Sequence, residues 1–132
     1  MSTRHADGRP LVLEHVSRAF GSGAARVNAV SDVSLAVEEG EIVAFVGPSG
    51  CGKTTLLSMA GCLLTPTSGR VSILGEDVGA MKQAQRAAFR LRHIGFVFQA
   101  YHLLAALNVR QNVEIALNLA GMAGSAAFER AE

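Results

Sequence analysis

The sequence predicts an α/β fold, in which strands alternate with helices that cover the sheet. Two segments, residues 42–46 and 94–98, are apolar at nearly every position, which is typical of strands buried on both faces of a parallel sheet. The first of these segments changes abruptly into a glycine-rich loop, and residues 53–60 then have a helical composition. A buried strand, a tight loop and a helix, in this order, form a common unit of α/β proteins.

The remaining elements follow from local patterns along the chain. Residues 1–10 are polar, and residues 11–20 are predicted to form a strand that ends at the turn Gly-Ser-Gly. Alternation of apolar and polar residues predicts half-buried strands at 33–37 and 69–74. Helices are expected over residues 83–93, after an N-cap at Asn108, and again from Ser125. We therefore expect a polar tail over residues 1–10 and one domain over residues 11–132.

The composition limits the classes of function. A chain of 132 residues with 49% apolar residues can form one domain with a core and is not a disordered chain. The net charge of +1 is too balanced for non-specific binding to nucleic acid or anionic lipid. Cys51 and Cys62 imply no disulfide framework and favour a reducing compartment; we interpret them as a loop residue and a small packed residue. With no secretory signal and no apolar run of membrane-spanning length, a soluble protein is expected.

The glycine-rich loop matches the phosphate-binding pattern G-x-x-x-x-G-K-[ST]. Small residues let the backbone wrap around a phosphate with its N–H groups pointing inward, and the helix that follows adds the positive end of its dipole. Lys53 is placed to reach the β- and γ-phosphates, the Thr54 hydroxyl to coordinate Mg²⁺, and Thr55 to bond a further phosphate oxygen. The alternative is a plain glycine-rich turn with a solvated lysine, but the flanking strand and helix favour nucleotide binding. The predicted site comprises Gly47, Pro48, Ser49, Gly50, Cys51, Gly52, Lys53, Thr54 and Thr55.

These motifs, in this order, resemble the ATP-binding subunits of ABC transporters from residue 11 onward. Gly40-Glu41 leads into the segment before the loop, and the turn Pro-Thr-Ser-Gly at 66–69 follows the loop helix, both as in the family. Residues 94–99 resemble the strand that ends in the family's Q-loop glutamine, here Gln99. Residues 101–107 and 112–114 resemble the branch of macrolide-export, lipoprotein-release and cell-division ATPases. The resemblance implies an ABC-type P-loop NTPase fold with an N-terminal antiparallel β part.

The resemblance also implies roles for two further residues. Phe20 stands where the family has an aromatic residue, usually tyrosine, that stacks on adenine; the residues alone leave open a core aromatic at a strand end. Gln99 is implied to be a catalytic residue that senses Mg²⁺ and the attacking water and couples the site to the membrane subunit. The residues alone leave open that Gln99 is a solvated strand end.

The cofactors and partners that the resemblance implies are those of a transport ATPase. They are ATP and Mg²⁺, an integral-membrane permease subunit, and a second ATP-binding subunit that forms a homodimer, with no nucleic acid. The implied location is peripheral, at the cytoplasmic face of the inner or plasma membrane.

Several motifs of the family are not found in these 132 residues. Hydrolysis needs an acidic residue on Mg²⁺ and a group that orients water, and none of the 11 acidic residues follows the apolar run that precedes Asp-Glu in the family. The Leu-Ser-Gly-Gly-Gln motif and the switch histidine are also missing. We therefore expect a domain truncated before its helical subdomain is complete, with segments 42–46 and 94–98 lacking strand partners. Marginal stability and no ATP turnover by this chain alone follow.

Other functions stay open beside ATP binding in a transporter. A soluble ABC-type ATPase of translation or DNA repair would need basic surfaces, and we interpret Arg86, Arg90 and Arg92 as a solvated helix face instead. A different P-loop kinase or GTPase is a second alternative, although no Asn-Lys-x-Asp segment for reading guanine is present. The third alternative is a non-functional partial-gene product that binds nucleotide without acting on it.

Overall fold

A computed structural model describes residues 8–100 and 102–132 of the chain. The chain divides into two compact units, the first ending at Arg86 and the second running from Ala87 to Glu132. The division falls within helix α2 (Gln83–His93).

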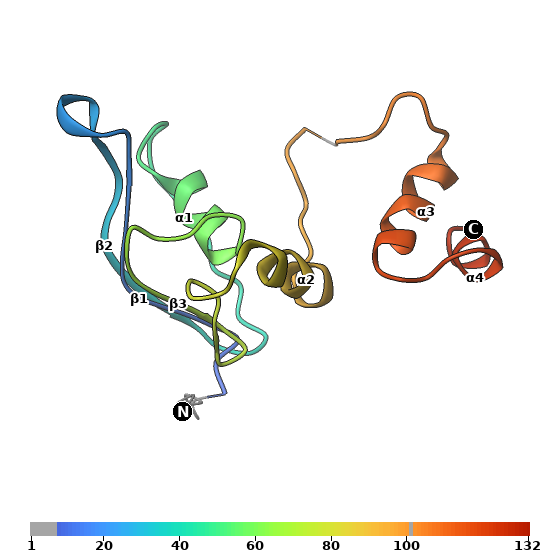
Figure 1. The fold of residues 1–132 in the computed structure, drawn as a ribbon, viewed down its shortest axis with the longest axis horizontal. Coiled ribbons are helices and arrows are strands. Elements are labelled where there is room, and N and C mark those ends of the chain that lie inside the picture. Colours follow the sequence, from blue (N-terminus) through green and yellow to red (C-terminus); the bar gives the residue numbers. More distant parts are fainter. Residues whose placement is uncertain (1–7, 101) are drawn as a thin grey trace. The chain divides into compact units, whose positions relative to one another are not determined.

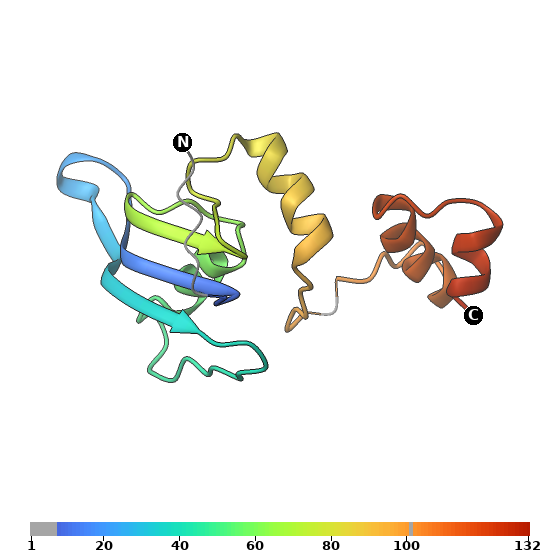
Figure 2. The same cartoon turned by 90° about the horizontal axis from the view of Figure 1, so that it is seen from below.

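The first unit contains one antiparallel sheet (Figures 1 and 2). Its strands are β1 (Leu11–Phe20), β2 (Val27–Val37), β3 (Ser68–Ile73) and β4 (Glu76–Asp77), in the order β2-β1-β3-β4. Between β1 and β2 lies the short 3-10 helix η1 (Gly23–Ala25). In the centre of β1, Leu13 lies opposite Leu35 of β2 and Val71 of β3. This sheet confirms the antiparallel β part that the sequence predicted, with β2 beginning six residues earlier than the alternating pattern indicated.

The pairing of β1 with β2 is interrupted by three bulges or irregularities, between residues 13 and 16, 16 and 18, and 18 and 19 of β1. His15 and Asp32 adopt positive φ angles of 49° and 51°, and their side chains meet at 2.7 Å between Nδ1 and Oδ1. Gly69 of β3 packs against the same place, where a Cβ atom would lie 2.3 Å from the carbonyl oxygen of His15. Bulges increase the local twist of a strand, and these lie just before the part of β1 that ends at Phe20.

Helix α1 (Lys53–Ala60) contacts β1, β2 and β3 and covers one face of the sheet (Figures 1 and 2). Leu13, Val16 and Val71 of the sheet are buried, as are Met59 of α1 and Cys62 just after it. Removal of this apolar surface from water holds the helix on the sheet. Because the loop at 47–52 leads directly into α1, the core also fixes one end of the loop.

Of the two cysteines, Cys51 is exposed and Cys62 is buried. The structure thus confirms that Cys51 is a loop residue and that Cys62 is a small packed residue.

The second unit contains most of α2, together with α3 (Val109–Leu119) and α4 (Ser125–Arg130). Asn108 caps α3: its side chain accepts from the Gln111 N–H at 2.9 Å, and the Gln111 side chain accepts from the Asn108 N–H at 3.0 Å. Arg110 of α3 pairs with Glu132 at 2.8 Å and lies 4.4 Å from the ring centre of Phe128 in α4. All helices that the sequence predicted are confirmed.

The prediction of buried strands at residues 42–46 and 94–98 is wrong for the structure as described. Neither segment is a strand, and Ile42 is 95% exposed and Val97 102% exposed. A strand exists only through hydrogen bonds to a neighbour, and no strand among residues 8–100 and 102–132 pairs with either segment. Apolar composition alone therefore does not bury these residues.

None of the helices in the described ranges could cross a membrane. The longest, α2 and α3, have 11 residues each, whereas a bilayer needs about 20.

Candidate functional site

The predicted phosphate loop lies between segment 42–46 and α1, with its last residue against strand β2. Gly52 is the N-cap of α1 and has a φ of +92°, in the left-handed region. A Cβ atom at this position would lie 2.1 Å from the carbonyl oxygen of Ala29 in β2. Only glycine permits both this backbone conformation and this close approach, so the sequence requirement at Gly52 comes from its contact with the sheet.

The N-terminus of α1 presents backbone donors. No side chain caps this end of the helix, and the first intrahelical bond runs from the Leu56 N–H to the Gly52 carbonyl at 2.9 Å. The N–H groups of Lys53, Thr54 and Thr55 therefore have no carbonyl one turn earlier in the helix to bond. Together with the helix dipole, such donors favour an anion at this end of the helix.

The Lys53 ammonium group lies over the loop. Its Nζ atom donates to the carbonyl oxygens of Gly47 at 2.7 Å and Pro48 at 2.6 Å, and it lies 3.5 Å from the Cys51 sulfur. The positive charge is thus held at the centre of the loop by the loop's own backbone. Lys53 thus brings Gly47, Pro48 and Cys51 together around its ammonium group, and the role of these residues in binding phosphate stays a prediction.

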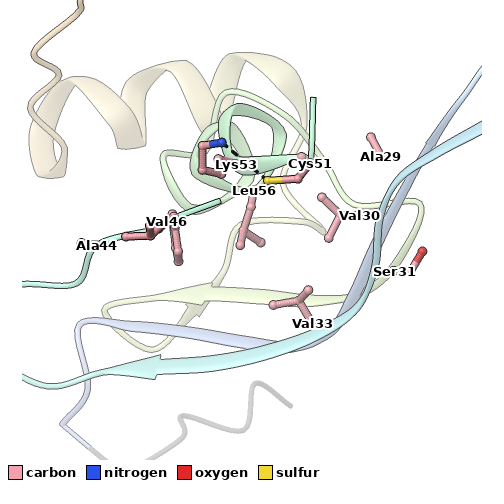
Figure 3. Close-up of a pocket in the computed structure, with 11 residues that line it drawn as sticks. Ala29, Val30, Ser31, Val33, Ala44, Val46, Cys51, Lys53 and Leu56 are labelled. Atoms are coloured by element: carbon pink, nitrogen blue, oxygen red, sulfur yellow. Dashed lines mark hydrogen bonds between the residues drawn. The ribbon is translucent and has the colours of Figure 1, made fainter. Parts of the chain in front are cut away.

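A cavity of about 500 Å³ lies beside the loop (Figure 3). Val30 and Val33 from β2, Leu56 from α1, and Val46 line it, while Lys53 closes it on the side of the loop. The lining is mainly apolar, which suits the packing of side chains and does not suit a polyanion. We therefore locate the phosphate site at the loop backbone and α1, not in this cavity.

Phe20 lies at the end of β1, close to the loop along the sheet. It pairs with Val27 of β2, two residues before Ala29, whose carbonyl touches Gly52. The displacement from Val27 to Ala29 is about 7 Å along the strand, and β1 lies about 5 Å to its side. Phe20 is 43% exposed, so part of its ring is open to a ligand.

Thr54 and Thr55 occupy the second and third positions of α1, and Thr54 is exposed. Residues 8–100 and 102–132 contain no group of three or more histidine, cysteine, aspartate or glutamate side chains that could hold a metal ion. The role of the Thr54 hydroxyl as a ligand of Mg²⁺ stays a prediction.

Gln99, the other predicted residue of the site, belongs to the second unit. It follows segment 94–98, in which the Phe96 and Phe98 rings stack at 5.5 Å, and it is exposed. The loop belongs to the first unit, and the role of Gln99 at Mg²⁺ stays a prediction.

A family model described as "ABC transporter" matches residues 30–132, which include the loop, α1 and Gln99. The chain belongs to the ABC transporter family. Phe20 precedes the matched range, so its assignment depends on the resemblance and on its place in the sheet.

Relatives of this ABC chain include macrolide export ATP-binding/permease proteins named MacB. The chain is 47% identical over 122 residues to that of Bradyrhizobium diazoefficiens and 42% identical over 132 residues to that of Bartonella henselae. These alignments cover 92% and 100% of the chain but only 19% and 20% of the relatives. The chain thus spans about a fifth of the length of the curated relatives it matches.

Among solved structures, the ABC chain is similar to the ATP-binding cassette MJ0796 in a dimeric post-hydrolysis state bound to ADP and Pi. The TM-score is 0.83 at 35% identity, and the match covers 92% of this chain and 53% of the other. A second dimeric structure of the same cassette, described as bacterial, matches with the same TM-score at 34% identity. The predicted ABC-type P-loop NTPase fold is confirmed.

Arg18 is a residue of the site region to which no motif points. Its guanidinium group lies 4.8 Å from the centre of the Phe20 ring. The sequence feature that could have identified Arg18 is its spacing from Phe20, because residues two apart in a strand lie on the same face.

Proposed function

We propose that this ABC chain binds Mg·ATP at residues 47–55 and that the complete assembly uses ATP hydrolysis to drive transport through a membrane permease. The observation that carries the proposal is the Lys53 ammonium group, held 2.6–2.7 Å from two loop carbonyls beside the uncapped start of α1. The cation, the backbone donors and the helix dipole act on the same small volume, which favours a group with several negative charges.

The hydrogen bonds of Lys53 also suggest how its ammonium group would exchange the loop carbonyls for the phosphate oxygens of a bound triphosphate. Bonds from an ammonium group to neutral carbonyls are weaker than bonds to ionised phosphate oxygens. A triphosphate in the loop can therefore draw the Lys53 Nζ from the Gly47 and Pro48 carbonyls, which lie 2.7 and 2.6 Å away. The exchange requires a side-chain movement and leaves the loop backbone in place.

Magnesium and hydrolysis extend the proposal beyond binding. Thr54 would coordinate Mg²⁺ through its hydroxyl, while Gln99 would sense the metal and the attacking water. The acidic residue that phosphoryl transfer requires is not found at the family's position in these 132 residues. We therefore propose that the chain by itself binds ATP without measurable turnover, so that binding without hydrolysis is the alternative function for this polypeptide.

The proposed partners are a second ATP-binding copy and a permease at the cytoplasmic face of the membrane. Support for the second copy comes from the dimeric state of the similar cassette. Support for the permease comes from the names of the relatives, which join ATP-binding and permease functions in one protein. Within the second unit, an apolar groove of about 310 Å³ follows the Gln99 region, and we propose that it receives an apolar segment of the permease; it is lined by Leu103, Leu104, Ala105, Leu107, Val109, Asn112 and Val113.

The test of nucleotide binding uses the only two lysines of the chain. Lys53→Ala should abolish Mg·ATP binding in calorimetry, because it removes the cation of the loop. Lys82→Ala is the matched control, since Lys82 is exposed at the start of α2, and it should bind as the wild type does. Equal affinities of the two variants would refute the site assignment.

A further inference from the structure

Arg18 packs against Phe20 at the end of β1. The guanidinium carbon of Arg18 lies 4.8 Å from the centre of the Phe20 ring, within the range of a cation–π contact. The Nη1 atom of Arg18 donates to the carbonyl oxygen of Thr65 at 2.9 Å. One side of the ring is therefore in contact with a charged group that is itself held in place.

The fold alone does not explain a charge at this position. Arg18 is half-buried, and its Nε atom is buried with no hydrogen-bond partner among the residues that the structure describes. A buried donor left unpaired destabilises the folded state. An apolar side chain could pack here without that cost, but it would make neither the hydrogen bond to the Thr65 carbonyl nor the cation–π contact with the Phe20 ring.

A hydrogen-bonded turn braces this pair against the helix of the phosphate loop. Thr65 and Thr67 belong to the turn after α1, whose first residue is Lys53. The Thr67 N–H donates to the Ser17 carbonyl at 2.8 Å, and the Thr67 hydroxyl accepts from the Ala19 N–H at 3.1 Å. The end of β1 is therefore tied to the same helix that carries the phosphate-binding lysine.

The Phe20 side chain is not fully covered by the protein. Phe20 is 43% exposed, and its strand partner Val27 lies two residues from Ala29, which touches the loop at Gly52. With the phosphates at the loop, as proposed, we expect the base of the nucleotide to lie along this part of the sheet. Stacking of a base on an aromatic ring depends on the ring being held in one orientation.

We propose that Arg18 is a positioning residue for the nucleotide base: it covers one face of Phe20 and fixes the ring so that the opposite face receives the base. This inference rests on the proposed ATP-binding function. Arg18 touches the aromatic ring and not the nucleotide, so it should affect recognition of the base without affecting recognition of the phosphates.

The experiment compares two ligands that differ in the base. Affinities for Mg·ATP and for inorganic tripolyphosphate with Mg²⁺ are measured by calorimetry on the wild type, Arg18→Gln, Arg18→Lys and Phe20→Ala. Glutamine keeps a donor for the Thr65 carbonyl and removes the charge, whereas lysine keeps the charge. Circular dichroism of each variant checks that the fold is retained.

The expected result is a loss that is specific to the base. Phe20→Ala should weaken ATP binding about 10- to 100-fold, and Arg18→Gln about five- to tenfold. Arg18→Lys should stay within about twofold of the wild type because a cation still covers the ring. Tripolyphosphate binding should be unchanged in all three variants, and Arg18→Gln should have no further effect in the Phe20→Ala background.

Several outcomes would overturn the inference. For Arg18→Gln, the overturning results are a wild-type affinity for ATP, an equal loss of affinity for ATP and for tripolyphosphate, or loss of the fold. An ATP affinity of Arg18→Lys that equals that of Arg18→Gln would also overturn it. The proposed function fails differently, through a wild type that binds neither ligand or through a Lys53→Ala variant that binds both normally. A wild type that requires Lys53 but is insensitive to Arg18 would refute the inference alone.

Discussion

Substitution of Gly52 by alanine tests the contact between the phosphate loop and the sheet. At a φ of +92°, an alanine costs about 1–2 kcal/mol in backbone strain. Its Cβ atom would also lie 2.1 Å from the Ala29 carbonyl oxygen, so the loop or β2 must move by about 1.3 Å to reach ordinary contact at 3.4 Å. Such a displacement costs a further 1–3 kcal/mol, roughly as overpacking does in a core. Gly52→Ala should therefore destabilise the first unit by about 2–5 kcal/mol.

The matched control is Gly50→Ala in the same loop. Gly50 has a φ of +81°, but a Cβ atom there would have no neighbour within 4 Å. This variant should carry the strain of about 1–2 kcal/mol without the clash. Hydrogen exchange of the α1 and β2 amides measures the local stability, and calorimetry measures Mg·ATP affinity. If both variants lost the same stability and the same affinity, the close packing of the loop on Ala29 would be refuted.

The remaining predictions concern the second unit and the exposed apolar segments. Asn108→Ala should destabilise the start of α3 by about 1 kcal/mol, because it removes the acceptor of the 2.9 Å bond from Gln111; amide exchange at residues 109–112 should quicken while ATP affinity is unchanged. Ile42→Ser should leave the amide protection of the sheet unchanged and raise the soluble yield, because Ile42 is 95% exposed; loss of protection would mean that Ile42 is packed. Leu104→Ser should reduce co-purification of the chain with the proposed permease subunit without changing ATP affinity, and wild-type recovery would contradict the proposed docking at this groove.

The elements that the sequence predicted well are those whose cause is local. The helix after Asn108 follows from a capping side chain and an apolar periodicity, and the structure shows both ends of the capping box. The loop follows from glycines at Gly50 and Gly52, whose positive φ angles other residues rarely adopt. In each case the residues that determine the geometry lie within a few positions of it in the chain.

The features that the sequence did not predict depend on distant partners. Segments 42–46 and 94–98 have the composition of central strands but are not strands, and the expectation that they lack strand partners is confirmed, since none of the described strands pairs with them. The Gly52 requirement is similar, because the atom that excludes a side chain belongs to Ala29, more than 20 residues earlier in the chain. The side chain of Arg18 is held by a hydrogen bond to the carbonyl of Thr65, 47 residues later in the chain. The hydrophobic periodicity of the sequence is a property of one segment at a time, so it does not show which distant residues contact each other.

The contacts that shape the loop also separate nucleotide binding from hydrolysis. The loop is held by the Ala29 carbonyl, by its continuation into α1, and by the bonds of Lys53 to its own backbone. None of these contacts uses a ladder at residues 42–46, so the loop can present its donors to a triphosphate without one. Hydrolysis requires reacting groups held to within fractions of an ångström, and a segment such as 94–98, with no ladder bonds, gives Gln99 no such support. We therefore expect this chain to bind Mg·ATP even where no ATP turnover is measured.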